Sequence, residues 1–502
     1  MNVVWFKRDL RIKDHEALTQ AAKHGPILPL YILEPELWNQ PDISYRHYVF
    51  LQDCLSDLSQ SLEKLGQKLI IKVGDAVDIL EELHISHATK SLWSHQETWN
   101  SWTYERDKKV KQWCKSRNIE WHEPVQNGVI RCLNTRDGWS SRWYNQMKKP
   151  LIENPLKIEV VAASSDNLPS YKELDLYKNE FDYLQKGGSI EALKLLTSFL
   201  YERGEAYTKE MSSPVTAFES CSRLSAQLAF GTLSMREVFQ ACEKRSQEIK
   251  KMPRGEKGKW PSAMRSFSGR LRWHCHFIQK LEDEPSIEFE NMHSAYNSLR
   301  ENDFNNDYFE AWKLGMTGYP MVDACMRALT ATGWLNFRMR AMLMSFASYH
   351  LWLHWQKPAL HLASLFTDYE PGIHYSQVQM QSGTTGINAI RIYNPIKQGI
   401  DHDPEGIFIR HWIPELREIA QEFIHMPWQD ASQINEYPMP IVDEKVAREA
   451  AAKKLYGLRR NNTSHKDTAK KIVSKHGSRK PTAPRTMSKK KIKNDNQREF
   501  LI

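Results

Sequence analysis

The sequence predicts an N-terminal α/β domain with a doubly wound parallel sheet, followed by an all-α C-terminal domain. Through about the first 125 residues, short apolar runs alternate with amphipathic stretches, which is typical of buried strands separated by helices. From about residue 186 onward, apolar residues recur at helical spacing instead. With 502 residues, 41% of them hydrophobic, the chain has enough core-forming material for two or three domains.

The apolar runs place the strands of the first domain. We expect strands at 3–6, 27–33, 69–73 and 91–93, with an amphipathic helix over 48–65. Ligands often bind at the carboxyl ends of such strands. No G-x-G-x-x-G or P-loop follows any of these runs, so a nucleotide held by a glycine-rich turn is not expected there.

The composition divides the chain into four parts. The α/β domain (1–125) is followed by a linker wrapped on the surface (126–185), the helical domain (186–445) and a basic, flexible tail (446–502). The last 52 residues account for all of the formal +8 charge. This tail is either a solvated terminus or an electrostatic arm for nucleic acid. In the helical domain, the spacing predicts helices over 190–203, 235–248 and 321–329.

Composition also excludes several classes of protein. No run of 18 apolar residues predicts a membrane span, and the first residues do not have the order of a secretory signal. The seven cysteines are scattered without a C-x-x-C pair, so we expect no disulfide framework and no zinc or iron–sulfur site. The i, i+2 spacing of His274 and His276 splits these ligands on a helix, so no metal is expected. A reducing cytoplasm fits best.

Three segments have the residue types of a binding site. Hydroxyls and backbone N–H groups at 220–225 suit a phosphate, although an ordinary helix cap is equally consistent. The second segment, 317–340, carries two arginines, Arg338 and Arg340, whose spacing places them on different helix faces. The third segment, 368–395, combines acids, a histidine and glycine-rich turns, which indicates a polar ligand.

In this order the three segments resemble the photolyase/cryptochrome family. The opening residues 4–18, V-W-F-K-R-D-L-R-I-K-D-H-E-A-L, are similar to that family's N-terminal signature. The late segments N-P at 394–395, D-P-E-G at 403–406 and I-R-H-W-I-P-E-L at 409–416 are similar to its C-terminal one. The resemblance covers about residues 1–445. It implies an α/β antenna domain, a helical domain that holds a U-shaped FAD, and electron transfer driven by blue light.

The resemblance also implies roles for individual residues. Tyr207, Ser222 and Ser225 would hold the ribose and phosphate of FAD. Arg340 would lie over the isoalloxazine and pair with Asp368. The remaining expected FAD contacts are Glu370, which faces the flavin and adenine, and His374 beside flavin N5. Trp334 matches the family's Gly-Trp motif and would serve packing more than chemistry. At the position of His374 photolyases usually have Asn; a histidine there could donate to reduced flavin or titrate near neutral pH.

The electron relay of the family is incomplete in this chain. Its innermost tryptophan falls on Val378, its middle one on Trp355 and its outer one near Asn302. A route through Trp352, Trp355, Tyr349 or Tyr369 is the alternative, and helical spacing would bring Trp352 and Trp355 together. The expected catalytic residues are His374, Trp355 and Trp352.

The pocket for damaged DNA also differs from the family pattern. The stacking tryptophan is present as Trp273, but the Glu three residues before it is Arg270. The positions that read the lesion fall on Phe337 and Ala341, which disfavours the (6-4) specificity. Trp273 and Phe337 could flank a flipped base, while Arg270 and Arg272 contact phosphate or carbonyl groups. The distal stacking position falls on Met380.

Two functions follow from the resemblance. The first is a photolyase that repairs cyclobutane pyrimidine dimers in DNA by electron transfer from reduced FAD; the second is a cryptochrome-like photoreceptor that signals without repair. Residues 94–107 resemble the family's inter-domain antenna strip, so a second chromophore of the folate or deazaflavin type is possible. We expect a monomer whose partner is DNA.

Overall fold

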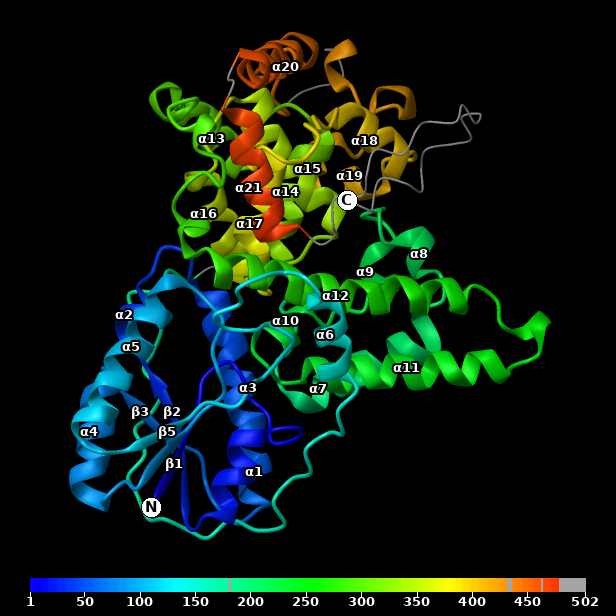
Figure 1. Cartoon of the computed structure of the whole chain (residues 1–502). Helices are drawn as coiled ribbons and strands as arrows, with labels where there is room; N and C mark the ends of the chain where they lie inside the picture. The colour runs from blue at the N-terminus through cyan, green and yellow to red at the C-terminus, as the bar shows by residue number, and fades with distance from the viewer. Residues whose placement is uncertain (179–180, 182, 431–435, 462–463, 478–502) are drawn as a thin grey trace.

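The computed structural model describes residues 1–178, 181, 183–430, 436–461 and 464–477. Figure 1 shows an α/β domain formed by the start of the chain and a helical domain formed by the rest. The sheet is entirely parallel with strand order β3-β2-β1-β4-β5. Its strands are β1 Asn2–Phe6, β2 Ile27–Leu33, β3 Ile70–Val73, β4 Ser91–Trp93 and β5 Glu120–His122. The predicted fold class is confirmed, and strands β1 to β4 coincide with the four apolar runs.

Helices cover both faces of the sheet (Figure 1). Alternating strand residues such as Val4 and Phe6 pack against α1 and α3, while Val3 and Trp5 pack against α4 and α5. Because successive side chains of a strand point to opposite faces, a fully apolar strand needs both layers. The helices of this domain are α1 Glu16–Lys23, α2 Pro35–Trp38, α3 Tyr45–Glu63, α4 Ala76–His87 and α5 Ser101–Ser116.

The helical domain begins after residue 186. Its first members are α7 Ser189–Ser198, a π-helix Phe199–Arg203, α8 Tyr207–Glu210, α9 Ala217–Ser220, α10 Ser225–Ala229, α11 Met235–Lys251 and α12 Trp260–Asp283. They are followed by α13 Asn306–Lys313, α14 Pro320–Thr332, α15 Phe337–Ser345, a π-helix Phe346–His350, α16 Gln356–Leu365, α17 Pro371–Ser382, α18 Pro395–His402 and α19 Ile407–Trp412. The helices expected over 190–203, 235–248 and 321–329 are present.

The two domains are joined by the loop that follows β1. The Arg11 guanidinium donates to the carbonyl of Gly231 at 2.8 Å, and the Arg236 Nε donates to the Asp14 carboxylate at 3.0 Å. Gly231 has φ +67°, and a Cβ there would lie 2.1 Å from the carbonyl oxygen of Arg8, so only glycine fits. The N-terminal signature therefore builds the contact between the domains.

Two segments differ from the sequence prediction. The segment expected to be a surface linker forms helix α6, Trp139–Met147, whose Trp143 is fully buried. The segment expected to be a flexible tail forms α20 Glu444–Asn461 and α21 His465–His476, and Leu455 of α20 is fully buried. Residues 478–502 of that segment lie outside the described residues. In the described part of the chain, no helix has the length and apolarity needed to cross a membrane.

Candidate functional site

The helical domain encloses a cavity of about 330 Å³ between α8, α10, α12, α15 and α17. It gathers residues from sequence positions as far apart as 207 and 381, and it brings together all seven side chains that were expected to contact FAD. These are Tyr207, Ser222, Ser225, Arg340, Asp368, Glu370 and His374. Three residues expected to meet DNA, Arg270, Trp273 and Phe337, line the same cavity. We call it the flavin cavity below.

A bidentate ion pair crosses the wall of the flavin cavity. The Arg340 guanidinium donates from Nη1 and Nη2 to the two Asp368 oxygens at 2.9 and 2.8 Å, and it stacks 4.0 Å from the Phe366 ring centre. Burial raises the pKa of Asp368, but the charge and hydrogen bonds of Arg340 outweigh this effect and hold the pKa below its usual value. The pair places a fixed negative and a fixed positive charge at the ligand surface.

Several buried polar atoms of the flavin cavity have no hydrogen-bond partner in the protein. They include Glu370 Oε1, Asn336 Oδ1, and both Gln377 Nε2 and Gln377 Oε1. The Asn336 amide is fixed, because its Nδ2 donates to the carbonyls of Met211 and Ser212 at 3.1 and 2.9 Å. Buried polar atoms left unpaired cost free energy, so this set indicates a polar ligand with both donors and acceptors. A flavin ring edge, with its carbonyls and nitrogens, fits that donor and acceptor set.

Two titratable residues of the cavity are held neutral. Burial raises the pKa of Glu370 to about 8, although the nearby Arg8 guanidinium opposes this shift. Burial lowers the pKa of His374 to about 4, and its Nε2 donates to the carbonyl of Ala359 at 2.9 Å. The expectation that His374 titrates near neutral pH is therefore wrong for this geometry, because the buried ring stays neutral with its Nε2 proton already used.

The mouth of the flavin cavity is aromatic and basic. Phe337 is 40% exposed, and Trp273 is half-buried and stacks on Phe277 with ring centres 5.7 Å apart. The Arg270 guanidinium lies 5.9 Å from the Phe337 ring centre. Two other residues expected at this surface do not line the cavity. Arg272 donates to Ser140 Oγ at 3.0 Å on α6, and Met380 lies elsewhere on α17.

A chain of buried aromatic rings connects the flavin cavity to a second cavity. Tyr369 lines the first cavity, and its ring centre lies 6.4 Å from that of Tyr375, which lies 6.2 Å from Trp355. Tyr375 and Trp355 line the second cavity, of about 680 Å³, between α5 and α16. The Tyr369 hydroxyl donates to Asp42 Oδ2 at 2.6 Å, and burial raises the pKa of this carboxyl group.

Trp352 does not join this chain of rings. The helix ends at His350, Trp352 has φ +54°, and no ring contact links Trp352 to Trp355 within the described residues. Trp352 instead lies between two cations, 4.5 Å from the Arg300 guanidinium and 4.3 Å from Lys454 Nζ on α20. The predicted contact between the two tryptophans is wrong, because it assumed a continuous helix.

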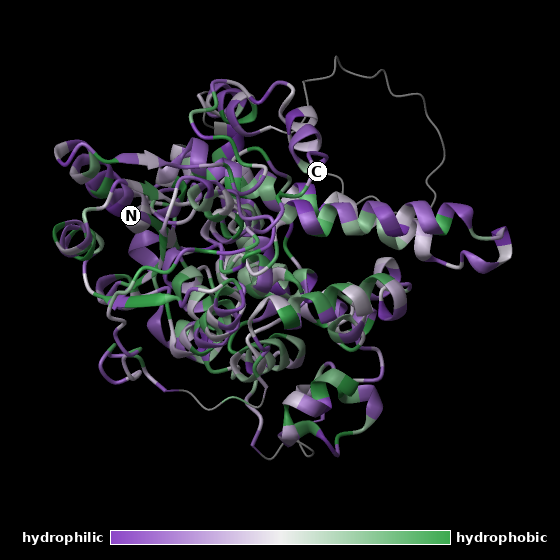
Figure 2. Ribbon diagram, turned by 90° about the horizontal axis from the view of Figure 1, so that it is seen from below, coloured by the Kyte–Doolittle hydropathy of each residue, from purple (hydrophilic) through white to green (hydrophobic). Residues whose placement is uncertain are grey.

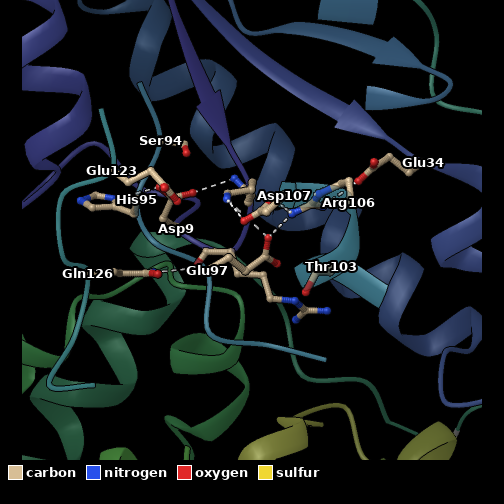
Figure 3. Close-up of polar contacts among 12 residues, drawn as sticks. Asp9, Glu34, Ser94, His95, Glu97, Thr103, Arg106, Asp107, Glu123 and Gln126 are labelled. Atoms are coloured by element: carbon tan, nitrogen blue, oxygen red, sulfur yellow. Dashed lines mark hydrogen bonds and ion pairs between the residues drawn. The ribbon is translucent and has the colours of Figure 1, made fainter. Parts of the chain in front are cut away.

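The carboxyl edge of the sheet holds a dense polar network rather than an open site (Figure 3). Arg106 donates to Glu34 at 2.7 Å and to Asp107 at 2.8 Å and also pairs with Glu97, while Lys7 Nζ lies 3.0 Å from Asp107. These five side chains are buried or nearly so. The crevice left beside them is only about 30 Å³. A ligand of chromophore size does not fit there.

No arrangement around residues 274–276 gathers metal ligands. His274 lines the flavin cavity, whereas His276 packs against Trp273 with ring centres 5.0 Å apart. Among the described residues, the one group with metal-ligand geometry is formed by Asp9, His15 and His95. Both imidazoles hydrogen-bond or ion-pair with Asp9 Oδ2, at 2.7 Å from His95 and 2.9 Å from His15. The group is thus internally paired below the sheet edge.

Four residues of these sites were not expected from the sequence: Asn336, Gln377, Tyr375 and Asp42. Asn336 lies inside the segment 317–340, which the sequence already indicated as part of a site, and Tyr375 directly follows His374. Their position next to expected site residues was the sequence signal that could have identified them. Asp42 offered no signal, because its contact with Tyr369 spans 327 positions.

Comparison with known sequences agrees with both domains. Residues 2–153 match the DNA photolyase family model, and residues 267–456 match the model of the FAD-binding domain of DNA photolyase. Cryptochrome-2 of Arabidopsis thaliana is 31% identical over 90% of this chain and 78% of its own length. The deoxyribodipyrimidine photo-lyase of Vibrio cholerae is 28% identical over 89% of this chain and 98% of its own.

Solved structures show the same architecture. A class III photolyase from Agrobacterium tumefaciens superposes with a TM-score of 0.78 at 25% identity, covering 92% of this chain and 98% of that one. An archaeal photolyase from Sulfolobus tokodaii, described with two FAD molecules, gives 0.75 at 25% identity over 91% and 100%. Because the two family models match one domain each and the Arabidopsis relative is 31% identical over most of both chains, this FAD-binding chain belongs to the photolyase/cryptochrome family.

Proposed function

We propose that the protein is a light-driven flavoenzyme that repairs cyclobutane pyrimidine dimers in DNA. The observation that carries this proposal is the mouth of the flavin cavity. Trp273 and the exposed Phe337 offer two aromatic surfaces to a base, and Arg270 lies beside them. Bases stack on aromatic side chains regardless of sequence, and enzymes that act on a base first flip it out of the duplex.

The cavity residues fit FAD and would divide its binding among them. Tyr207, Ser222 and Ser225 would take the ribose and phosphates, while Arg340 and Asp368 orient the ring system through their bidentate pair. Bound FAD supplies a carrier that exchanges single electrons after absorbing blue light. Neutral Glu370 and neutral His374 would add no charge next to the ring, whereas the Arg340–Asp368 pair would present one charge of each sign there.

A second chromophore, of the folate or deazaflavin type, would bind between the domains. The inter-domain cavity of about 680 Å³ offers the ring of Trp102, the amide of Asn100 and the carboxylate of Glu105. Its volume lies in the range of small-molecule sites, whereas the crevice at the sheet edge is smaller than a single ring system.

We further propose that electrons enter the flavin cavity along Trp355, Tyr375 and Tyr369. When Tyr369 gives up an electron, its phenolic proton moves to Asp42 Oδ2. Tyr375 then passes an electron and its own phenolic proton to the Tyr369 radical across their 3.4 Å hydroxyl contact. Trp355 gives an electron to the Tyr375 radical, and the Asp42 proton returns through the Tyr369 hydroxyl to Tyr375. In protein that lacks the second chromophore, an external thiol finally reduces Trp355 at the second cavity. We expect Tyr375→Phe to slow thiol-dependent photoreduction of FAD about tenfold, measured by absorbance under blue light. Trp352→Phe is the control and should photoreduce at the wild-type rate; equal slowing in both variants would refute the route.

Repair itself is tested directly with the FAD-loaded protein. The protein is photoreduced without oxygen, mixed with an oligonucleotide that contains one thymine dimer, and illuminated with blue light. We expect intact thymines to reappear, measured by chromatography, and Trp273→Ala to weaken binding of the damaged strand more than Trp273→Phe, by about 1–3 kcal/mol. Failure to restore thymines while FAD is bound and reduced would exclude repair.

Photoreception without repair is the second candidate. The replacement of the family's Glu by Arg270 at the base-stacking surface favours it, as does the ring chain that ends at a solvent-reachable cavity. In that case, illumination should reduce the flavin and change the protease sensitivity of the chain, while dimer-containing DNA remains unrepaired.

A further inference from the structure

Helices α11 and α12 form a hairpin that projects from the body of the protein (Figures 1 and 2). Its outer half, residues 244–265, holds eight Lys and Arg against two Glu. Six of these cations are exposed: Lys244, Lys250, Lys251, Arg254, Lys259 and Arg265. The function proposed above uses none of them.

The hairpin is packed as a stiff support for these charges. Its inner face buries Ile249, Trp260 and Met264, and the Arg245 guanidinium stacks 5.0 Å from the Trp260 ring centre. The turn is tied to the domain, because the backbone N–H of Lys259 donates to Glu205 Oε1 at 2.9 Å. A side chain that is held on a fixed backbone needs less ordering on binding than one on a mobile loop.

The exposed cations have no acidic partners. Within the described residues, the one ion pair of the outer half joins Arg245 to Glu248 at 3.5 Å, and no carboxylate oxygen lies within 4 Å of the charged side-chain nitrogens of the six exposed cations. Like charges gathered without counter-charges repel one another and raise the local positive potential. The surface is therefore complementary to a polyanion.

Helix α12 connects this surface to the mouth of the flavin cavity. It carries Arg265 on its exposed part and Arg270 and Trp273 where it lines the cavity. From Lys259 to Trp273 the helical rise of 1.5 Å per residue gives about 21 Å. Duplex DNA carries about one charge per 1.7 Å of its axis, so this length corresponds to roughly a dozen phosphates, or about six base pairs.

We propose that the α11–α12 hairpin is an arm that contacts the phosphates of duplex DNA on one side of a base held at the cavity mouth. The proposal rests on the DNA partner of the proposed function but does not require repair. An acidic membrane is the other polyanion to consider. The outer half exposes no large hydrophobic side chain that could anchor in lipid, which favours nucleic acid.

The test compares two variants that each lose four positive charges in the FAD-loaded, full-length protein. The arm variant carries Lys250→Ala, Lys251→Ala, Arg254→Ala and Lys259→Ala. The control carries Lys64→Ala, Lys68→Ala, Lys111→Ala and Lys115→Ala, all of them exposed residues of the α/β domain. Binding to a labelled, undamaged 20-base-pair duplex is measured in the dark by fluorescence anisotropy at several salt concentrations.

We expect the Kd of the arm variant to rise at least about tenfold at low salt, and the slope of log K against log salt to become shallower by about 2–4. The control should stay within about twofold of wild type. Equal losses in both variants would mean a net-charge effect and overturn the proposal, as would an unchanged Kd and slope in the arm variant.

A measurement on the unmodified protein covers the case in which the arm variant fails to fold. Lysine acetylation, read by mass spectrometry, should be suppressed by the duplex at Lys250, Lys251 and Lys259 but not at Lys64 or Lys111. Absence of protection overturns the proposal, as does protection by phosphatidylserine vesicles alone. Because these assays use undamaged DNA in the dark, they can fail while repair succeeds, and the reverse.

Discussion

The flavin cavity and the carboxyl edge of the sheet are both places where the fold offers a ligand site, yet they differ in how their polar groups are satisfied. At the sheet edge, Arg106 and Lys7 are paired with three carboxylates, and about 30 Å³ remains open. In the flavin cavity, Gln377 and Glu370 keep unpaired polar atoms around about 330 Å³.

The comparison shows that fold topology locates a possible site and that side-chain pairing decides whether it takes a ligand. A switch point in a parallel sheet is a frequent binding crevice. Here the crevice is filled by charged side chains that neutralise one another. Such a buried network is stabilising only while every partner is present, because removing one leaves an uncompensated buried charge. In the helical domain, the unpaired polar groups can hydrogen-bond to a ligand that enters the cavity.

The largest effect should come from breaking the network at the sheet edge. Arg106→Ala leaves Glu34, Glu97 and Asp107 buried without their main counter-charge, so we expect the free energy of unfolding to fall by about 3–5 kcal/mol in urea titrations. Arg117→Ala removes a solvent-screened pair with Glu81 and should cost far less. If both variants lose the same amount, the edge network is not the stabilising unit described here.

The next effect concerns ligand binding rather than folding. Asp368→Ala leaves Arg340 without its bidentate partner at the ligand surface, so we expect the Kd for FAD to rise about 100-fold, measured by fluorescence titration of apoprotein. Arg272→Ala removes a guanidinium that does not line the cavity and should bind FAD as wild type does. Normal FAD affinity in the Asp368 variant would contradict the assignment of this pair to the cofactor.

The smallest effect is a pH dependence of the apoprotein. The pKa of Glu370 is about 8 in the folded protein and near 4.5 in the unfolded chain. The folded state therefore binds this proton more tightly, and its contribution is complete below pH 4.5 and declines as the pH rises to about 8. Relative to Glu370→Gln, we expect wild-type apoprotein to lose roughly 2–3 kcal/mol of stability between pH 6 and 8. If wild-type apoprotein instead gained stability relative to Glu370→Gln as the pH rises, this would contradict a buried, neutral Glu370.

Much of the α/β domain was predictable because its strands are buried on both faces and so read as continuous apolar runs. The fifth strand, Glu120–His122, was not, since it is a three-residue edge strand with a polar residue at each end. Helix α6 was missed for a related reason. Its buried positions Trp139, Trp143 and Met147 recur every four residues over only two turns, and the Pro, Asn and Ser around this short pattern favoured a linker.

The residues of the site were predictable where they lie in motifs that resemble those of the family. The flavin-cavity residues converge in space as expected, and their individual roles stay predictions. Contacts that depend on tertiary packing were not accessible, as the pairing of Asp42 with Tyr369 shows. The path at Trp352 was misjudged because a left-handed backbone residue ends the helix there, and neither composition nor spacing signals such a break.

The ion pair between Asp14 and Arg236 also has a consequence for folding of the chain during its synthesis on the ribosome. The loop after β1 is synthesised first, yet its partners emerge more than 200 residues later. Until then, Arg11 and Asp14 lack the backbone and guanidinium groups that they bind in the native protein. The N-terminal sheet can form early during synthesis, but its first loop reaches its final state only after the helical half has left the exit tunnel.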